Sequence, residues 1–422
     1  MDQGNTAFLL IASALVLLMT PGLAFFYGGL VKAKSVISMM MMSFGALGLI
    51  GVLWVLYGYA IAFSNEGVGN FVGIDGIIGI DTAELGLAGV YSEAMDVQGD
   101  FPLIAFAAFQ ATFAIITVAL ISGAIADRAK FGSWMVFAGI WATVVYFPVA
   151  SWVFNFTLGD DGAVVDGGWI AYTVGAIDFA GGTAVHINAG AAALALALVL
   201  GKRVGFAKGA HVPHNPPFVL LGAGLLWFGW FGFNAGSELA ADGVAAIAFL
   251  NTIAAPAAAI LGWLVVERIK DGKPTSVGAA SGAVAGLVAI TPACASLTPG
   301  WAILLGIIAG VVCALAIDLK FKLGFDDSLD VVGIHLVGGL IGTLYIGFFG
   351  TGVGLFVGAD ASQLGRQAIA AFAVMLYSFV LSYAIGWIIQ KTMGFRVNNE
   401  DEIAGIDTVV HGEEGYVLTP SR

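Results

Sequence analysis

The chain has few charged residues for its length. Aspartate, glutamate, lysine and arginine make up 10% of its 422 residues, whereas soluble globular proteins carry about 25%. Hydrophobic residues make up 59%, and the mean hydropathy is +0.96. So few charges cannot cover the surface of a water-soluble fold. The composition therefore excludes an ordinary soluble protein and indicates a chain that lies in a lipid bilayer.

The chain is also poor in cysteine and in clustered basic residues. Its two cysteines, Cys294 and Cys313, lie in apolar stretches, so we interpret them as small buried side chains. They offer no disulfide framework and no cysteine metal site. The net charge of −12 and the lack of a long basic run argue against nucleic acid as a partner. No nucleophile–base set or phosphate loop stands out, so we expect neither enzyme activity nor a cofactor.

Long apolar runs are what the sequence has in abundance. A helix needs about 20 apolar residues to cross a bilayer, and we find eleven such runs. The first could pass for a signal peptide, but Met1 is followed by Asp2 rather than a basic segment, and no small-residue cleavage site precedes Lys32. We therefore expect it to be retained as the first span. The spans lie near residues 7–31, 37–63, 101–126, 132–156, 174–200, 217–238, 243–266, 276–296, 300–319, 331–356 and 367–391.

The basic residues predict which side of the membrane each loop lies on. All but one of the 16 follow an odd-numbered run, the exception being Arg366. Because lysine and arginine gather in cytoplasmic loops, we expect the amino terminus outside and the carboxyl tail in the cytoplasm. The residues that follow odd-numbered runs are Lys32, Lys34, Arg128, Lys130, Lys202, Arg203, Lys208, Arg268, Lys270, Lys273, Lys320, Lys322, Lys391, Arg396 and Arg422.

The acidic residues divide almost evenly between the two sides, but the surplus of negative charge lies on the outer side, where half of the 28 acids meet a single base, Arg366. An acidic outer face would concentrate cations near an external opening. Plain solubility of the outer loops is the alternative explanation. The outer acidic residues are Asp2, Glu66, Asp75, Asp81, Glu84, Glu93, Asp96, Asp100, Asp160, Asp161, Asp166, Glu238, Asp242 and Asp360.

A few ionisable residues fall inside the predicted spans, where they are costly and therefore candidates for function. The fifth span contains Asp178 and, eight residues later, His186; Asp327 and His335 have the same spacing at the tenth. This correspondence suggests two repeats of five spans with opposite topology. A pseudo-two-fold axis in the membrane plane would bring the two histidines together near the midplane.

Two neutral imidazoles can satisfy each other by one hydrogen bond and leave a donor or acceptor free at each end. Such a pair could pass a small polar molecule or relay a proton. Histidines that simply pack remain the alternative, and a metal site is weaker because no cysteine, glutamate or third histidine stands at ligand spacing. Asp178 has two compatible interpretations: it holds a broken helix, or it stabilises a bound cation.

Phe109 and Phe113 are four residues apart, which places both on one face of a helix in the third span. Aromatic faces attract cations by about 0.5–2 kcal/mol per ring, although aromatic stripes in spans more often serve packing. A second aromatic segment, residues 230–237, lies in the sixth span.

These residues and several motifs resemble the ammonium transporter, methylamine permease and Rhesus class of proteins. The resemblance covers essentially the whole chain. Its motifs are FYGGL at 26–30, DFAGGTAVHINAG at 178–190, WFGFNAGS at 230–237, GKPTSVGAASGAVAGLVAITPAC near 273–294 and DVVGIH at 330–335.

The resemblance implies an eleven-span homotrimer in which each subunit has its own narrow apolar pore. It implies that His186 and His335 are the twin histidines of the pore. Phe113 and Phe233 match the stacked gate, with Phe109 beside it at the outer vestibule, where it would contribute to substrate binding. The outer substrate site would include Ser237, which contacts ammonium, and Asp178, which supports that site, with Trp230 and Thr291 lining the same region.

One position departs from the family's pattern. Members often have a tryptophan as a wall of the outer site at the end of the fourth span. Here that position is Phe154, and we expect Trp152 to face elsewhere. Phenylalanine is a weaker cation–π partner than tryptophan, so we expect a looser outer site with the pore chemistry retained.

The resemblance also implies the domain organisation. We expect one transmembrane domain over residues 1–392, with repeats at about 7–200 and 217–356 and a last helix at 367–391. Residues 393–422 would form a cytoplasmic regulatory tail that packs on the cytoplasmic face and binds a PII-class signalling protein. The location would be the cell membrane, and the substrate ammonium or ammonia, with methylammonium as a further candidate.

The implied mechanism recruits ammonium at the aromatic mouth, removes a proton and conducts ammonia past the histidines, because an ion in an apolar channel is costly. Two other classes stay open. A bis-histidine haem protein would also place histidines inside spans, and a sensor would bind ammonium without significant flux.

Overall fold

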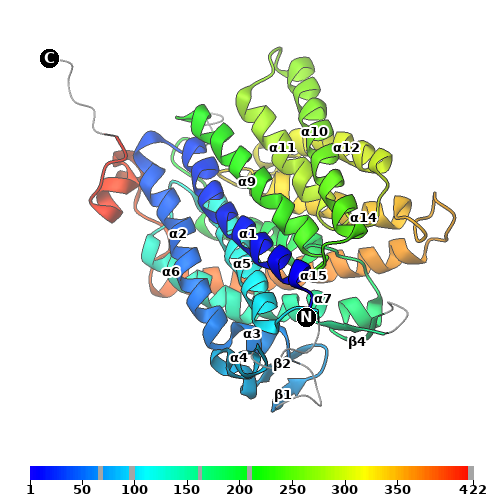
Figure 1. Ribbon diagram of the computed structural model, residues 1–422. Helices are drawn as coiled ribbons and strands as arrows, with labels where there is room; N and C mark the ends of the chain where they lie inside the picture. Colours follow the sequence, from blue (N-terminus) through cyan, green and yellow to red (C-terminus); the bar gives the residue numbers. More distant parts are fainter. Residues whose placement is uncertain (65–69, 95–99, 160–163, 207–211, 417–422) are drawn as a thin grey trace.

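The structure is a bundle of long, apolar helices (Figure 1). The computed structural model describes residues 1–64, 70–94, 100–159, 164–206 and 212–416. Within these ranges ten helices are long and apolar enough to cross a membrane, and Ser276–Ile290 is apolar but shorter. The polytopic all-α class is therefore confirmed. Six of the charged residues used above lie outside the described residues: Glu66, Asp96, Asp160, Asp161, Lys208 and Arg422.

The first half of the chain forms five membrane-length units, several of them interrupted by a π-helical turn. In chain order they are α1 (Gln3–Leu30); α2 (Val36–Leu53), η2 (Trp54–Gly58) and α3 (Tyr59–Ala62); α5 (Leu103–Ile121) and η4 (Ser122–Ile125); α6 (Phe131–Trp141), η5 (Ala142–Tyr146) and α7 (Phe147–Phe154); and η7 (Gly182–Ile187) with α8 (Asn188–Leu200).

The second half repeats this order and adds a long last helix. Its elements are α9 (Pro216–Gly236), α10 (Gly243–Lys270), α11 (Ser276–Ile290), α12 (Pro299–Ala316) with α13 (Leu319–Leu323), η9 (Val332–Leu336) with α14 (Val337–Phe349), and α15 (Ser362–Thr392).

Short elements connect and flank the bundle. Two antiparallel hairpins, β1 (Phe71–Ile74) with β2 (Ile78–Asp81) and β3 (Phe156–Leu158) with β4 (Val164–Gly167), follow the second and fourth units. The others are η1 (Ala33–Ser35), η3 (Thr82–Leu87), α4 (Ala88–Ala94), η6 (Ile170–Val174), α16 (Asn399–Ala404) and η10 (Asp407–His411).

Side-chain caps set where several helices begin. The carboxylate of Asp2 accepts a hydrogen bond from the Asn5 amide at the start of α1, and Asn215 does the same for Phe218 at the start of α9. Asp242 accepts from the amides of Val244 and Ala245 at α10. Each cap satisfies amides that have no partner within the helix.

The predicted spans agree with the helices to within a few residues except at three places. The fifth helix begins at Gly182 rather than near 174, because Gly175 and Gly181 have φ of +70° and +112°. Helix α11 ends at Ile290, because Pro292 has no amide to continue the hydrogen-bond ladder. Helix α14 ends at Phe349, and the glycine-containing segment 350–356 forms turns instead.

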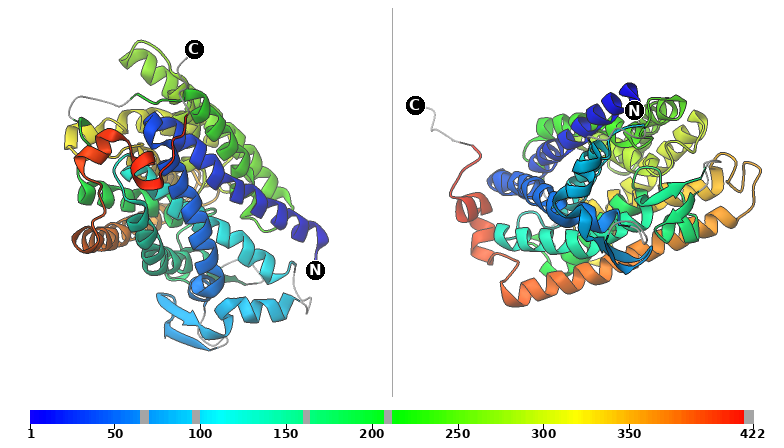
Figure 2. Two further views of the ribbon diagram at one scale, coloured as in Figure 1. Left: turned by 90° about the vertical axis from the view of Figure 1, so that its left-hand side faces the viewer. Right: turned by 60° about the horizontal axis from the view of Figure 1, so that its bottom comes forward.

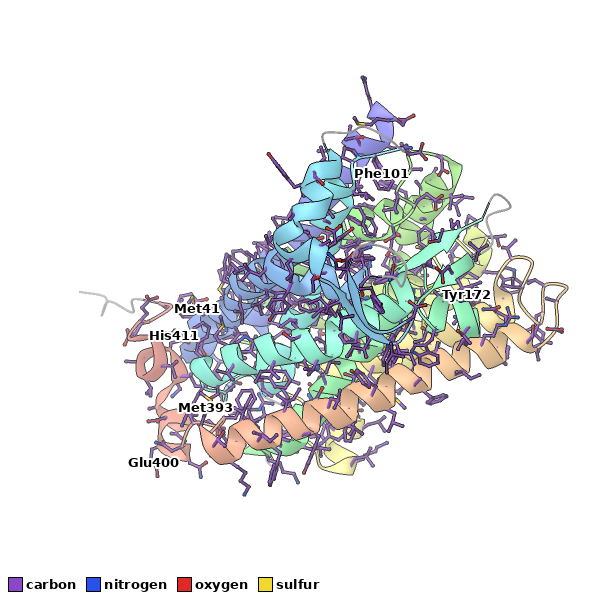
Figure 3. The ribbon with its side chains drawn as sticks, turned by 90° about the horizontal axis from the view of Figure 1, so that it is seen from below. Met41, Phe101, Tyr172, Met393, Glu400 and His411 are labelled. Atoms are coloured by element: carbon purple, nitrogen blue, oxygen red, sulfur yellow. The ribbon has the colours of Figure 1, made fainter. Side chains whose placement is uncertain are left out.

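Corresponding elements of the two halves pack in a reciprocal way. Helices α1 and α9, the first of each half, contact each other extensively, as Figure 1 shows, and α8 contacts η9 while α14 contacts η7. This reciprocity supports the predicted repeat. Helix α15 runs along one side of the bundle, as the orange helix of Figure 2 shows. Met393, Glu400 and His411 lie at one end of the bundle, far from Phe101 and Tyr172 (Figure 3). We call these the tail end and the mouth end.

Candidate functional site: two cavities separated by a stacked phenylalanine pair

The chain is irregular just before the helix that carries His186. Residues 175–181 are not helical, so Asp178 lies before the helix rather than within it, which corrects the prediction. Its carboxylate accepts hydrogen bonds from the amides of Gly181, Gly182 and Thr183 at 2.9, 2.6 and 2.8 Å. It also accepts from the Thr183 hydroxyl and the Ala184 amide. The interpretation of Asp178 as the cap of a broken helix is thereby confirmed.

Two glutamines of α15 satisfy further backbone groups of this irregular segment. Gln367 accepts from the Ile177 amide at 2.7 Å and donates to the Ile177 carbonyl at 2.7 Å. Gln363 donates to the carbonyl of Gly175 at 3.2 Å. Non-helical backbone at membrane depth is tolerated only where its polar groups find partners within the protein, and these side chains supply them.

His335 lies in an equivalent position in the second half. Its segment, η9, begins where the carboxylate of Asp327 accepts a hydrogen bond from the Val332 amide at 2.7 Å. Asp178 makes the same contact, across the same five residues, to Thr183. Both histidines therefore lie on π-helical turns that an aspartate caps, and the shared spacing in the sequence reflects shared local structure.

The two histidines meet in the middle of the bundle. The Nδ1 atoms of His186 and His335 lie 3.2 Å apart, and the exposed fractions of the two residues are 1% and 3%. One nitrogen donates and the other accepts, according to the tautomers. Nε2 of His186 is buried and has no hydrogen-bond partner among the described residues. It is therefore available to a small polar guest.

A small, almost wholly apolar cavity of about 10 Å³ adjoins this pair. The indole of Trp230 lies nearly parallel to the ring of His186, with centroids 5.5 Å apart. The cavity's lining consists of Met19, Leu23, Phe26, Ile116, Leu120, Val185, His186, Leu226, Trp230, Phe233, Val284 and His335. It has room for a molecule of about the size of water.

Two stacked phenylalanines close this inner cavity on one side. The rings of Phe113 and Phe233 are 4.1 Å apart between centroids and inclined by 22°. Phe233 lines the inner cavity, and Phe113 lines a larger cavity of about 450 Å³, which we call the vestibule. The stacked pair therefore lies between the two spaces.

The vestibule combines aromatic and polar side chains. Phe154 meets Phe113 edge to face, with centroids 6.2 Å apart. Ser237 donates to the carbonyl of Phe233 at 2.8 Å, which leaves its oxygen free to accept. The lining residues are Phe106, Gln110, Phe113, Val153, Phe154, Phe156, Leu158, Val164, Ala171, Ala176, Ile177, Asp178, Phe179, Ser237, Glu238 and Leu239.

Three residues that the sequence assigned to the outer site lie elsewhere. Phe109 is fully buried and packs edge to face on Phe113 without lining the vestibule. Trp230 lines the inner cavity, because it lies almost two helical turns before Ser237 on α9. Thr291 is fully buried and accepts a hydrogen bond from the Trp230 indole at 2.8 Å. This hydrogen bond fixes the orientation of the Trp230 ring.

The expectation for Trp152 is confirmed. Its indole donates to the carbonyl of Ile77 and packs against Trp169 and Tyr377, whereas Phe154 faces the vestibule.

The sequence did not assign several polar or aromatic residues to the vestibule, among them Gln110, Phe179 and Glu238. Each of these three is next to an assigned residue in the sequence, and this adjacency could have identified it. Gln110 lies between Phe109 and Phe113, Phe179 follows Asp178, and Glu238 follows Ser237.

At the tail end an ion-pair network joins the loops to the tail. Arg203 donates to Asp326 through Nη2 and to Asp127 through Nη1, both at 2.9 Å. The carboxylate of Glu402, in α16, accepts from Arg396 at 2.7 Å and from the Val204 amide at 2.6 Å. A cavity of about 330 Å³ lined by Lys32, Arg203 and Lys320, among others, lies at this end.

No cluster of three or more histidine, cysteine, aspartate or glutamate residues in the described part of the chain could hold a metal ion. The histidine pair does not fit a haem, because a haem iron would lie between the two ligand nitrogens, whereas these nitrogens contact each other directly.

Membrane-length helices around a vestibule, a closed ring pair and an inner cavity define a polytopic helical membrane transporter. Comparison with known proteins specifies it further. The sequence profile described as Ammonium Transporter Family matches residues 7–416. An ammonium transporter of Mycobacterium bovis is 56% identical, over 98% of this chain and 90% of that protein.

Comparison with solved structures gives the same family. A structure titled Sensor Amt Protein has a TM-score of 0.87 at 27% identity, covering 97% of this chain and 98% of that one. The structure of Mep2 from Saccharomyces cerevisiae has a TM-score of 0.81 at 33% identity, covering 94% and 91%. The chain belongs to the ammonium transporter family, a family of transporters rather than enzymes.

Proposed function

We propose that this protein moves ammonium across a membrane by binding the ion in the vestibule, removing a proton and conducting ammonia through the inner cavity. The observation that carries the proposal is the contact of His186 with His335, 3.2 Å between Nδ1 atoms, within an apolar cavity behind the stacked phenylalanines.

The vestibule suits a small cation. The aromatic residues Phe113 and Phe154 line it, and Ser237 offers an acceptor oxygen. Asp178 acts mainly through the helix that it caps, because five donors already occupy its carboxylate.

The inner cavity suits a neutral guest. Moving an ion into apolar surroundings costs several kcal/mol or more, whereas ammonia carries no charge. Nε2 of His186 can hydrogen bond to ammonia, whose size the cavity matches. Methylammonium would bind in the vestibule and pass more slowly, because its methyl group needs additional room.

We further propose the cell membrane as the location, with the mouth end outside and the tail end in the cytoplasm. Lys32, Arg203 and Lys320 line one cavity at the tail end, in agreement with the positive-inside rule.

We also propose a homotrimer and a regulatory tail recognised by a PII-class protein. Sedimentation in detergent and pull-down with that protein test these two proposals.

A sensor that binds ammonium without flux is the second candidate, because a structural neighbour is titled Sensor Amt Protein. Flux decides between the two. Purified protein in liposomes, given ammonium pulses across a range of pH, should show saturable ammonium uptake or current.

The variants His186→Ala and His335→Ala should change flux or the preference for ammonium over methylammonium at least severalfold. Cys313→Ala, a buried change that touches neither cavity, serves as the control. If both histidine variants behaved like the parent, the proposed pore would be wrong. If the parent bound ammonium but moved none, the sensor would be the better description.

A further inference from the structure

Glu238 is the first residue after Ser237 at the end of α9, and it is half-buried in the wall of the vestibule. The same cavity contains the aromatic rings of Phe113 and Phe154 and the carboxylate of Asp178. Glu238 therefore brings a second carboxylate to the space in which the proposed function places the ammonium ion.

The other carboxylates near Glu238 are engaged in holding the backbone. Five donors satisfy Asp178, and Asp242 accepts from the amides of Val244 and Ala245 at 2.9 and 3.0 Å. The neighbour of Glu238 is another acid, because its carboxyl group shares a hydrogen bond with that of Asp242. Burial, together with the charge and hydrogen bond of Asp242, raises the pKa of Glu238 to about 7. A bound cation would relieve this unfavourable arrangement.

We propose that Glu238 is a cation-binding residue of the vestibule, where its carboxylate attracts the ammonium ion and accepts a hydrogen bond from it. The proposal rests on the proposed function. The aromatic wall here is Phe154, a weaker cation–π partner than tryptophan. The attraction of a charge extends over longer distances than that of a ring quadrupole. A carboxylate at this position therefore compensates for the weaker attraction of the Phe154 ring for the cation.

The test compares Glu238→Gln with the parent in ammonium uptake by liposomes. The substitution keeps size and hydrogen-bonding capacity while it removes the charge. We expect KM to rise roughly fivefold, about 1 kcal/mol, with kcat within twofold, because recruitment and not passage is affected. Glu238→Asp, which keeps the charge on a shorter side chain, should lie between the two.

Asp360→Asn is the matched control, since it removes a fully exposed acid on the mouth side that does not line the vestibule. We expect it to leave KM unchanged. A Glu238→Gln variant with the parent's KM would overturn the proposal, and so would an equal rise in KM for Asp360→Asn, which would indicate a general field effect.

The failure of this inference can be distinguished from failure of the proposed function. A parent that moves no ammonium contradicts the proposed function. Calorimetric binding of ammonium to purified parent and Glu238→Gln protein still tests the residue in that case, with weaker binding expected for the variant. Equal binding by the two proteins would overturn the role of Glu238.

Discussion

The Nδ1 atoms of His186 and His335 lie 3.2 Å apart although 149 positions separate the two residues in the chain. Each histidine lies on a π-helical turn whose first amides donate to an aspartate carboxylate, that of Asp178 in one half and that of Asp327 in the other. The pair is thus held by two similar pieces of backbone that meet inside the bundle, and its geometry depends on both caps.

The two histidines should act as a unit. Replacing either by alanine leaves the other without its partner, so the second replacement removes less than the first. We expect the combined loss of ammonium flux in His186→Ala/His335→Ala to be clearly smaller than the product of the single losses. His186→Ala combined with Cys313→Ala should instead be multiplicative. Independent effects of the two histidines would contradict a shared hydrogen bond.

The cap at Asp178 should contribute to stability as well as to transport. Asp178→Ala leaves several amides of η7 without an acceptor, at about 1–3 kcal/mol for each one that stays buried. We expect a clearly lower melting temperature in detergent and loss of flux, with a smaller effect for Asp178→Asn, whose oxygen still accepts. An unchanged melting temperature for Asp178→Ala would show that water or a rearranged backbone replaces the cap.

Phe154→Trp should tighten the vestibule. A tryptophan presents a larger, more electron-rich face, and the cavity of about 450 Å³ has room for it. We expect the KM for ammonium to fall about two- to fivefold, measured as initial uptake rate against concentration. Trp152→Phe, a change that faces away from the vestibule, should leave KM unaltered. A KM that does not respond to Phe154→Trp would argue against cation–π contact at this wall.

Recruitment should weaken in acid if Glu238 contributes its charge. The pKa of Glu238 is raised to about 7 by burial and by Asp242, so the carboxyl group gains a proton as the outer pH falls from 8 to 6. Asp242 is the charged group that acts on it, and Asp178 is the other acidic residue that lines the vestibule. The parent's apparent affinity for ammonium should decline over this range more steeply than that of Glu238→Gln. Parallel pH profiles would assign the dependence to another group.

The tail-end ion pairs should stabilise the fold at neutral pH but not in strong acid. Burial alone would raise the pKa of Asp326, but the hydrogen bonds and charges of Arg203 and Arg128 outweigh it and hold that pKa below the ordinary value. The stabilisation is therefore complete above about pH 4 and is lost as the pH falls through the lower, folded-state pKa. Asp326→Asn should cost about 3–5 kcal/mol at pH 7, seen as a lower melting temperature. The difference from the parent should shrink near pH 3, and a constant difference would contradict this linkage.

Much of the fold could be predicted because membrane helices depend on local composition. An apolar run of about 20 residues has few alternatives in a bilayer, so most predicted spans agree with the helices. The errors fall where local and tertiary effects compete. Residues 174–181 are apolar enough for a span, yet Gly175, Gly181 and the glutamines of α15 stabilise an irregular backbone there.

The sequence predicted which residues belong to the candidate site better than it predicted where each of them lies. Phe113, Phe154, Asp178 and Ser237 do line the vestibule, and Phe233 lines the inner cavity with the histidines. Trp230 and Thr291 were expected in the outer region and lie deeper, since the depth of a side chain depends on where its helix starts. The sequence identifies Glu238 only as one of the acidic residues on the outer side. No sequence pattern indicates which of these acids lines a cavity.

The sequence by itself determined the membrane class, the apolar runs and the matched aspartate–histidine spacing, because each of these is a property of neighbouring residues. Only the tertiary structure decided that His186 and His335 touch, that Phe113 and Phe233 stack across the path, and that Trp152 faces away. Those relationships join residues from distant parts of the chain. They exist because the helices pack in one arrangement, which local patterns cannot specify.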